Sequence, residues 1–128
     1  MEEHFHTQFK KHRYPTRYVS LDKTIALVCT VSHRYEKTTY NYWFKISSPH
    51  KHFLDSFSRS YAVFGCGDSS QILLFPYAEL TRWLEKTGKS DGRDTCWHHV
   101  QFLIESNKKV SSILEGHNQR IDVTNYLL

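Results

Sequence analysis

Cysteine, glycine and proline are scarce in this sequence of 128 residues, and no long apolar run occurs in it. The three cysteines, Cys29, Cys66 and Cys96, are odd in number and lack C-x-x-C spacing, which is typical of reduced thiols in a cytoplasmic protein. No apolar stretch approaches the length of a membrane span, so we expect no membrane partner. Because residues 1–17 are polar and rich in histidine, we also expect no signal peptide.

Recognisable catalytic motifs are absent as well. The segment Gly65–Asp68 is not followed by Gly-Lys-Ser/Thr, which excludes a phosphate-binding loop of the Walker type. Cys66 stands between two glycines at what we expect to be an exposed turn, where a small structural residue is a simpler interpretation than a nucleophilic thiol. The sequence therefore defines no reaction by itself.

Aromatic and basic residues are what the sequence does contain in quantity. Eight tyrosines, eight phenylalanines and three tryptophans make up 15% of the chain, and the formal net charge is +4 with neutral histidines. Such a charge is compatible with a polyanionic partner, although ordinary cytosolic proteins also reach it. So many rings predict that some remain on the surface for contact.

The segment of residues 60–85 is expected to organise the fold. Its two short apolar runs, residues 61–64 and 72–75, are joined by a glycine-rich turn, which predicts a buried hairpin. After Pro76, apolar residues recur at helical spacing, which predicts an amphipathic helix. The buried face of that helix is expected to comprise Tyr77, Leu80, Trp83 and Leu84.

Two strands and a helix are expected before this hairpin. Residues 24–31 are β-branched and apolar on both alternations, which predicts a central strand. Residues 39–46 alternate between apolar and polar, which predicts a half-buried strand antiparallel to the first. Ser48 followed by Pro49 then predicts the start of a short helix.

The last third of the chain is expected to hold one clear strand. Residues 96–104 alternate, which predicts a strand with His98 on one face and His99 on the opposite face. Residues 89–95 are polar and predict a loop. Residues 106–128 are compatible with a helix or with strands, and the pattern does not decide between them. Near the end, Asp122 is placed to cap a last helical turn.

These segments predict a single α+β domain with a mixed or antiparallel central β-sheet flanked by two or three helices. Its expected bounds are residues 18–128, preceded by a basic, His-rich lead-in or arm at residues 1–17. The residues expected to be largely buried are Ile25, Leu27, Val28, Val63, Phe64, Ile72, Leu74 and Leu80.

Aromatic and basic residues interleave at several places. Nucleic-acid readers use such sets, with cations on phosphates and rings stacked on bases, but any sheet with one wet face gives the same pattern. A second basic cluster, residues 50–52, opens the expected helix, where it could hold a phosphate or simply be solvated. The residues expected to bind nucleic acid are Arg34, Trp43, Lys45, Arg93, Trp97 and His98.

The order of the expected elements resembles the core of the PD-(D/E)XK nucleases, in which acids on two strands hold a catalytic divalent metal. That resemblance implies a Mg²⁺ or Mn²⁺ cofactor. The position two before Lys45 is Trp43 instead of an acid, so we expect no metal and no cofactor. The alternative is a divergent metal-dependent nuclease, whose candidate catalytic residues are Asp55, Asp68, His98 and His99.

A closer resemblance is carried by Tyr-Trp-Phe at 42–44, Gly-Cys-Gly at 65–67, the proline-led helix at 76, Asp-Gly-Arg at 91–93 and Trp-His at 97–98. From about Tyr18 onward, the chain resembles an uncharacterised bacterial domain that accompanies restriction or defence genes. The resemblance implies a DNA partner in a restriction-type or mobile-element setting, and no defined reaction. A third hypothesis is a protein-interaction subunit that forms a homodimer or joins a larger restriction-type complex.

Overall fold

The computed structural model describes residue 5 and residues 8–11, 16–36, 39–67, 71–91, 95–114 and 119–128. In these residues, ten strands form two five-stranded sheets, and two α-helices pack between the sheets. The prediction of an α+β fold with mixed and antiparallel strands is therefore confirmed, with the strands divided between sheet A and sheet B.

Sheet A is built from β1 (Phe9–Lys11), β2 (Arg17–Ser20), β3 (Ile25–Ser32), β5 (Arg59–Cys66) and β6 (Ile72–Pro76), in the order β1-β2-β3-β5-β6. Neighbouring strands are antiparallel except β3 and β5, which run parallel from the pair Ile25–Arg59 to the pair Ser32–Cys66. A strand that is apolar on both faces belongs in the middle of a covered sheet, which explains the central place of β3.

Sheet B is built from β4 (Tyr42–Ser47), β7 (Gly88–Asp91), β8 (Cys96–Ile104), β9 (Val110–Ile113) and β10 (Arg120–Asp122), with all pairs antiparallel. Its main order is β10-β9-β8-β4. The first part of β8 also pairs with β7, and its last part pairs with β9. The long strand β8 is therefore the centre of this sheet.

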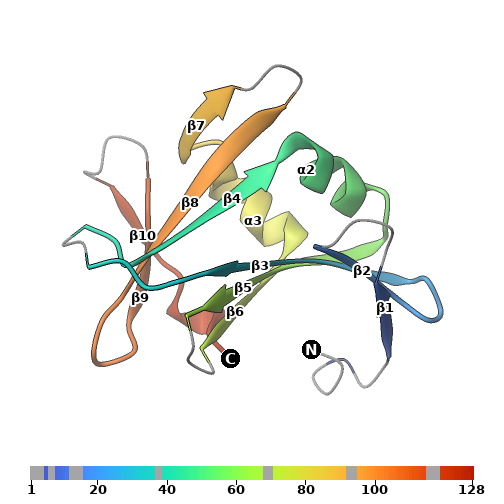
Figure 1. Ribbon diagram of the computed structural model, residues 1–128, viewed down its shortest axis with the longest axis horizontal. Coiled ribbons are helices and arrows are strands. Elements are labelled where there is room, and N and C mark those ends of the chain that lie inside the picture. The colour runs from blue at the N-terminus through green and yellow to red at the C-terminus, as the bar shows by residue number, and fades with distance from the viewer. Residues whose placement is uncertain are drawn as a thin grey trace.

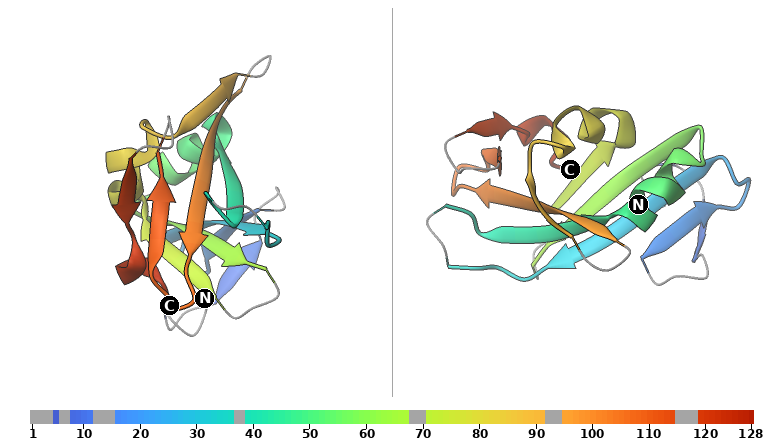
Figure 2. Two further views of the ribbon diagram at one scale, coloured as in Figure 1. Left: turned by 90° about the vertical axis from the view of Figure 1, so that its left-hand side faces the viewer. Right: turned by 90° about the horizontal axis from the view of Figure 1, so that it is seen from above.

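The two sheets form a wedge that the helices fill. In Figure 1 the sheets approach each other on the left and diverge toward the right, where α2 (Ser48–Asp55) and α3 (Tyr77–Leu84) lie between them. Figure 2 shows the same two layers from two further sides. Helix α2 follows β4 of sheet B and leads into β5 of sheet A, and α3 packs on β5 and β6. The helices thereby close the open side of the core.

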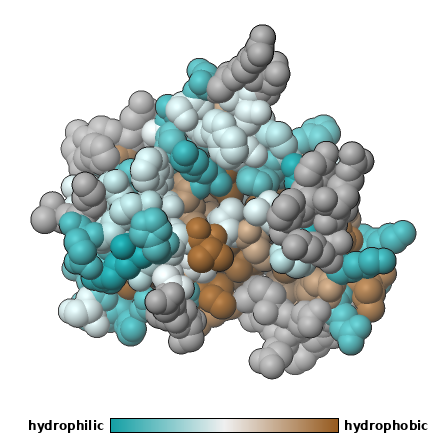
Figure 3. Space-filling model, in the orientation of Figure 1, coloured by the Kyte–Doolittle hydropathy of each residue, from teal (hydrophilic) through white to brown (hydrophobic). Residues whose placement is uncertain are grey.

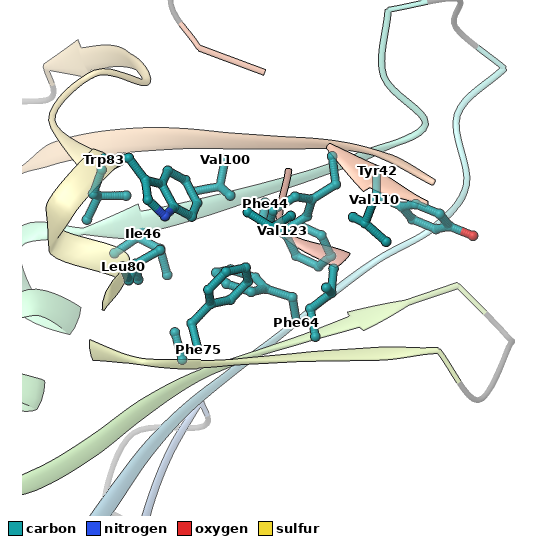
Figure 4. Packing of buried hydrophobic residues seen from close by; sticks show 14 of the residues in the cluster. Tyr42, Phe44, Ile46, Phe64, Phe75, Leu80, Trp83, Val100, Val110 and Val123 are labelled. Carbon is teal, nitrogen blue, oxygen red and sulfur yellow. The ribbon is translucent and has the colours of Figure 1, made fainter. Parts of the chain in front are cut away.

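Four phenylalanines join the two sheets at the centre of the core. Phe64 of β5 lies between the sheets with its ring centroid 4.9 Å from Phe44 of β4 and 5.3 Å from Phe102 of β8. Phe75 of β6 stands 5.7 Å from Phe64. Figure 4 shows side chains from β4 and β8 pointing toward those from β5 and β6. Close contacts of this kind add to the free energy of apolar burial.

The outer face of sheet A carries a second apolar cluster. Its buried members are Ile25, Leu27, Val63 and Leu74, and Phe5 packs against them with its ring 4.8 Å from that of Tyr61. Of the eight residues predicted to be buried, all are buried except Ile72, which is partly exposed. In Figure 3 hydrophobic side chains gather in a band over β3, where Val31 is 79% exposed.

The predicted pairing of residues 24–31 with residues 39–46 is wrong, because β3 belongs to sheet A and β4 to sheet B. Instead, β3 lies between the preceding strand β2 and the later strand β5, and β4 pairs with the distant strand β8. An alternating pattern specifies which face of a strand is buried, but it does not name the neighbouring strand.

Strands also form where a lead-in arm or a loop was predicted, and in the segment left undecided between helix and strand. Strand β1 and the start of β2 lie within residues 1–17, and β7 occupies part of the predicted loop at residues 89–95. Residues 106–128, left open between helix and strand, contribute β9 and β10. A last turn is present as predicted, a 3₁₀ helix over Thr124–Tyr126, but its N-cap is Val123 and not Asp122. The Asp122 carboxylate accepts the Thr124 N–H at 2.9 Å from just before the turn.

Candidate nucleic-acid interface

The face of sheet B that points away from sheet A carries three of the six predicted binding residues, Trp43, Lys45 and Trp97. Side chains alternate along β8, so His98 points into the core while Trp97 and His99 point outward. The β4–β8 register places Lys45 opposite His99, and directly opposed residues share a face. Trp43, two residues before Lys45, lies on that face as well. The pairing thus brings residues from two distant strands together.

Five rings make contact at one end of this face, and we call them the aromatic cluster: His33, Tyr35, Tyr40, Trp43 and His99. Ring centroids are 4.4 Å apart for His33 and Tyr35, 6.1 Å for Tyr35 and Tyr40, 6.3 Å for Tyr40 and Trp43, and 5.4 Å for Trp43 and His99. All five rings retain some contact with solvent. Their tilted and edge-to-face contacts join the five rings into one continuous aromatic platform.

One cation stands over a ring of the aromatic cluster, and a second, Arg34, is exposed in the chain between His33 and Tyr35, with its guanidinium hydrogen-bonded to Tyr42. The Lys45 ammonium lies 5.6 Å from the centroid of the Trp43 ring, within the range of a cation–π contact, and the side chain is exposed. Arg34 Nε lies 3.3 Å from Glu36 Oε1, and both side chains are more than half exposed. An exposed ion pair of this kind contributes little and opens readily for another anion.

A chain of hydrogen bonds fixes Trp43 and His99. The Trp43 indole Nε1–H donates to His99 Nδ1 at 3.1 Å, and His99 Nε2 lies 2.8 Å from the Ser90 hydroxyl. An indole N–H can only donate, so Nδ1 must be the acceptor and Nε2 must carry the proton of the neutral ring. The ring therefore donates to Ser90. Burial, followed by the nearby Lys45 charge, lowers the pKa of His99 and favours this neutral form.

This tautomer has a consequence for catalysis. A histidine that activates a serine hydroxyl must accept the hydroxyl proton on a free ring nitrogen. In His99 the nitrogen facing Ser90 already carries a proton, because Trp43 occupies the other nitrogen. The Ser90–His99 pair is therefore arranged to hold Trp43 in place and is not arranged as a nucleophile and its base.

His98 does not lie with the other predicted binding residues. Its side chain is 2% exposed and faces the interior, where Nε2 lies 3.4 Å from the Lys51 ammonium and 3.7 Å from Glu85 Oε1. Burial, followed by the Lys51 charge, lowers the pKa of His98. Hydrogen bonds from Lys51 and then Lys89 hold the pKa of Glu85 at about 2. Because β8 alternates, His98 cannot reach a ligand on the outer face.

The other predicted residues are placed as follows. Trp97 lies on the outer face of β8, partly buried, opposite Ser47 of β4 and Ser90 of β7. Arg93 and Asp68 lie outside the described residues. The predicted interface is thus represented in the structure by Arg34, Trp43, Lys45 and Trp97, which share one side of sheet B or its adjoining loop.

The basic start of α2 is explained by helix capping. The helix begins one residue earlier than predicted, with Ser47 as the N-cap. The Ser47 hydroxyl accepts the His50 N–H at 3.3 Å, and His50 Nδ1 accepts the Ser47 N–H at 3.2 Å. His50 Nε2 lies 3.1 Å from the Thr16 hydroxyl, which completes the ring's contacts. His50 here takes the place that Glu or Gln usually fills in a capping box.

Asp55, a candidate for the nuclease alternative, lies at the end of α2. The candidate histidines have other neighbours: His98 lies beside Lys51 and Glu85, and His99 beside Trp43 and Ser90. It is beside the Tyr77 hydroxyl, and burial, followed by this carboxylate, raises the pKa of Tyr77 to about 12. Asp55 and Tyr77 line a cleft of about 420 Å³ between α2, the start of β5 and the start of α3. Arg59 and Tyr61 also line this cleft, and none of the predicted nucleic-acid-binding residues does.

Metal ligands do not converge in the described part of the chain: no group of three His, Cys, Asp or Glu side chains there could hold an ion. The expectation that Cys66 lies in an exposed turn is wrong. It is fully buried against the core, and burial raises the pKa of its thiol to about 12. A thiol with a raised pKa is a poor nucleophile.

Comparison of the chain with protein-family models, with curated proteins and with solved structures gave no match. The resemblance to a bacterial domain of restriction or defence systems thus stays a prediction. Within the described residues, no helix has the length and apolarity needed to cross a membrane.

The sequence pattern did not predict that two residues, Tyr35 and Tyr40, belong to the aromatic cluster. Tyr40 was expected on the face of Tyr42 and Phe44, but β4 begins only at Tyr42, and the Tyr40 ring contacts Trp43 instead. Tyr35 belongs to a polar link, where no periodicity indicates what a side chain contacts. The available signal was local: aromatic and basic residues are interspersed between His33 and Lys45.

Proposed function

We propose that this chain is a nucleic-acid-binding domain whose interface is the aromatic cluster and Lys45 on the outer face of sheet B. The observation that carries the proposal is that the β4–β8 register brings Trp43, His99 and Lys45 together, and that the rings of the segment before β4 pack against Trp43. Proteins that bind nucleic acid combine cations that hold the backbone with rings that stack on bases. The aromatic cluster with Lys45 contains both kinds of group in one patch, and Arg34 is exposed in the adjoining loop.

The charge of the whole chain supports the proposal. A formal net charge of +4 favours encounter with a polyanion at low salt. The resemblance to a domain of restriction or defence systems points to DNA as the first nucleic acid to test. The proposal leaves His98 out of the interface, because its buried place in the Lys51–Glu85 cluster gives it a structural role.

The test is a binding titration of a short labelled DNA, as a duplex and as a single strand, over a series of salt concentrations. Affinity is expected to fall with salt with a slope of about −0.9 per phosphate contact for a duplex and about −0.7 for a single strand. Replacing Lys45 by Ala should weaken binding and flatten the slope.

The matched control is Lys86→Ala, which removes the same charge from the exposed turn after α3. This variant should retain the wild-type slope to a greater extent than Lys45→Ala. No measurable binding of either DNA at low salt, or equal effects of the two variants, would refute an interface centred on Lys45.

A further inference from the structure

We infer that the interface takes a single strand, with unpaired bases stacked on the aromatic cluster. This inference rests on the proposed function and names the class of nucleic acid that is bound. Three rings of the cluster, those of Tyr35, Tyr40 and Trp43, lie close together. Their centroids are 6.1 Å apart for Tyr35 and Tyr40, 6.3 Å for Tyr40 and Trp43, and 6.4 Å for Tyr35 and Trp43. Stacking on such a ring needs the flat face of a base, and in a duplex that face is covered by the next base pair.

The described rings of the aromatic cluster do not have the shape that reads a duplex, although β7 and β8 of the same sheet pair as an antiparallel ribbon. Duplex sequence is read in the grooves by a helix or a projecting two-stranded ribbon. Here the rings lie against a sheet, half-buried among one another, so they cannot reach deep into a groove. The basic start of α2 was another candidate site for a duplex phosphate. There the backbone N–H groups of Ser47 and His50 are already bonded within the capping box, so they do not face a ligand.

Lys45 is placed to change partners when a base binds. In the free protein its ammonium lies over the Trp43 ring, at 5.6 Å from the centroid. A base that stacks on this ring takes that position, and the flexible, exposed lysine side chain can move to the adjoining phosphate. The ring is therefore covered by a cation until a strand arrives, and the same cation then contributes to holding the strand.

The Trp43 ring is positioned before binding. Its N–H is held by His99, which in turn is held by Ser90 of β7. The adjoining backbone is fixed by Asn41, whose side chain is buried and hydrogen-bonded to both backbone groups of Ile104 at 2.9 Å. A platform that is already ordered loses little entropy when a base stacks on it.

The experiment compares oligothymidylate of about twelve nucleotides, the matching oligouridylate, and a hairpin duplex of equal charge by fluorescence anisotropy. We expect one or both single strands to bind at least about 10-fold more tightly than the duplex, since each stacked base contributes roughly 5- to 150-fold. The oligothymidylate and oligouridylate arms show whether a strand of the DNA type or of the RNA type binds more tightly.

Substitutions test whether the aromatic cluster is responsible for single-strand binding. Trp43→Phe keeps a ring and should retain most of the single-strand affinity, whereas Trp43→Leu should lose about 5-fold or more. Tyr61→Leu, on the outer face of sheet A, removes an aromatic ring elsewhere and should leave affinity unchanged. Lys45→Glu, at an exposed site, should weaken binding without affecting folding, which thermal denaturation checks for each variant.

The outcomes separate this inference from the function on which it rests. A duplex bound as tightly as the single strands, or more tightly, overturns the inference and leaves a nucleic-acid-binding domain. Single-strand binding that Trp43→Leu, correctly folded, does not weaken also overturns it. Failure of every nucleic acid to bind overturns the proposed function and the inference together.

Discussion

The indole N–H of Trp43 donates to Nδ1 of His99 across 3.1 Å, and this one contact determines which nitrogen of the imidazole carries the proton. Since His99 Nε2 then donates to Ser90, the hydrogen bonds tie together β4, β8 and β7 on the outer face of sheet B. A surface of exposed rings would otherwise be free to rotate. The link therefore explains how an aromatic platform is kept in one arrangement.

The first prediction concerns this tautomer. The Trp43 N–H bonds to the lone pair of His99 Nδ1 and so disfavours a proton on that nitrogen. Trp43→Phe removes this donor, so the pKa of His99 should rise from its lowered state toward the ordinary histidine value. The measurement is a pH titration of the imidazole nitrogens by NMR, which also reports the tautomer. In the wild-type protein the proton should be on Nε2.

The matched control is Trp97→Phe, because Trp97 lies on the same face of β8 and no hydrogen bond joins it to His99 among the contacts described. This variant should leave the titration of His99 unchanged. A wild-type proton on Nδ1, or equal titration curves for the wild type and Trp43→Phe, would contradict the assigned hydrogen bond.

The second prediction is that mild acid destabilises the fold. Burial is the largest cause of a lowered pKa at His50, His98 and His99. The unfolded chain therefore binds more protons than the folded one once the pH falls below about 6.5, the ordinary histidine pKa. The stability that these groups contribute is present above that pH and is lost as the pH falls toward the folded-state values.

Urea titrations from neutral to mildly acidic pH measure this loss as a falling free energy of unfolding. Carboxylates add little to this loss above about pH 5, because the lowered pKa values of Asp22, Asp122 and Glu85 reduce stability only as the pH falls through the ordinary values of 3.8 and 4.5. Replacing His50 with Gln, which can still accept the Ser47 N–H, should reduce the slope. A free energy of unfolding that is constant down to about pH 5 would contradict the prediction.

The sequence was sufficient for elements whose signal is local. The alternation of residues 96–104 predicted β8 and the opposite placement of His98 and His99, and the helical spacing after Pro76 predicted α3. The buried hairpin of β5 and β6 was also correctly predicted, since two apolar runs and a turn are enough to specify it.

What the sequence could not specify depends on distant partners. Nothing in β4 indicates that its neighbour is β8, more than 50 residues away, so the platform of Trp43 and His99 was not foreseeable as a unit. The role of His50 was hidden for a related reason: capping patterns lead one to look for Glu or Gln at that position. Cys66 was misplaced because its burial comes from the packing of two sheets, while its neighbours indicated only a turn.

The third prediction compares two glycines at the end of β5. Gly67 has φ +67°, and a Cβ there would lie 3.3 Å from the Tyr42 hydroxyl oxygen. Gly67→Ala should therefore lower the free energy of unfolding by about 1–2 kcal/mol, the cost of a side chain in this backbone region. Gly65 has room for a Cβ, whose nearest neighbour would be Val31 Cγ2 at 3.5 Å.

Gly65→Ala is thus the matched control. It should leave the free energy of unfolding unchanged or raise it by up to about 1 kcal/mol, since alanine has fewer unfolded conformations to lose. Chemical denaturation of both variants gives the comparison. Equal losses at the two positions would show that the backbone conformation at Gly67 is not what requires glycine.

The fourth prediction concerns the outer cluster of sheet A. Leu74 is 7% exposed and packs with Leu27 and Val63, so Leu74→Ala should cost roughly 2–5 kcal/mol. Ile72 lies in the same strand and is only partly buried, so Ile72→Ala should cost less. A loss under about 0.5 kcal/mol for Leu74→Ala in a urea titration would mean that this face of the sheet is not packed in solution.

The last prediction is that this chain alone does not cut DNA. Metal-dependent hydrolysis of a phosphodiester needs carboxylates that converge on one phosphate. In the described part of the chain no such set forms, and the nuclease candidates separate: Asp55 lies beside Tyr77, His98 is buried, and His99 is held by Trp43. Lys45 can hold a phosphate, but a cation without neighbouring acids cannot assemble a metal site.

Supercoiled plasmid incubated with the pure protein and Mg²⁺ or Mn²⁺ should therefore remain supercoiled, as judged on a gel that separates nicked and linear forms. The same preparation should retard single-stranded DNA, which shows that it is folded and able to bind. Because Asp68 lies outside the described residues, Asp68→Ala is tested beside Asp55→Ala. Cleavage that a chelator stops, and that either substitution abolishes, would contradict the prediction and make the divergent nuclease the better account of this chain.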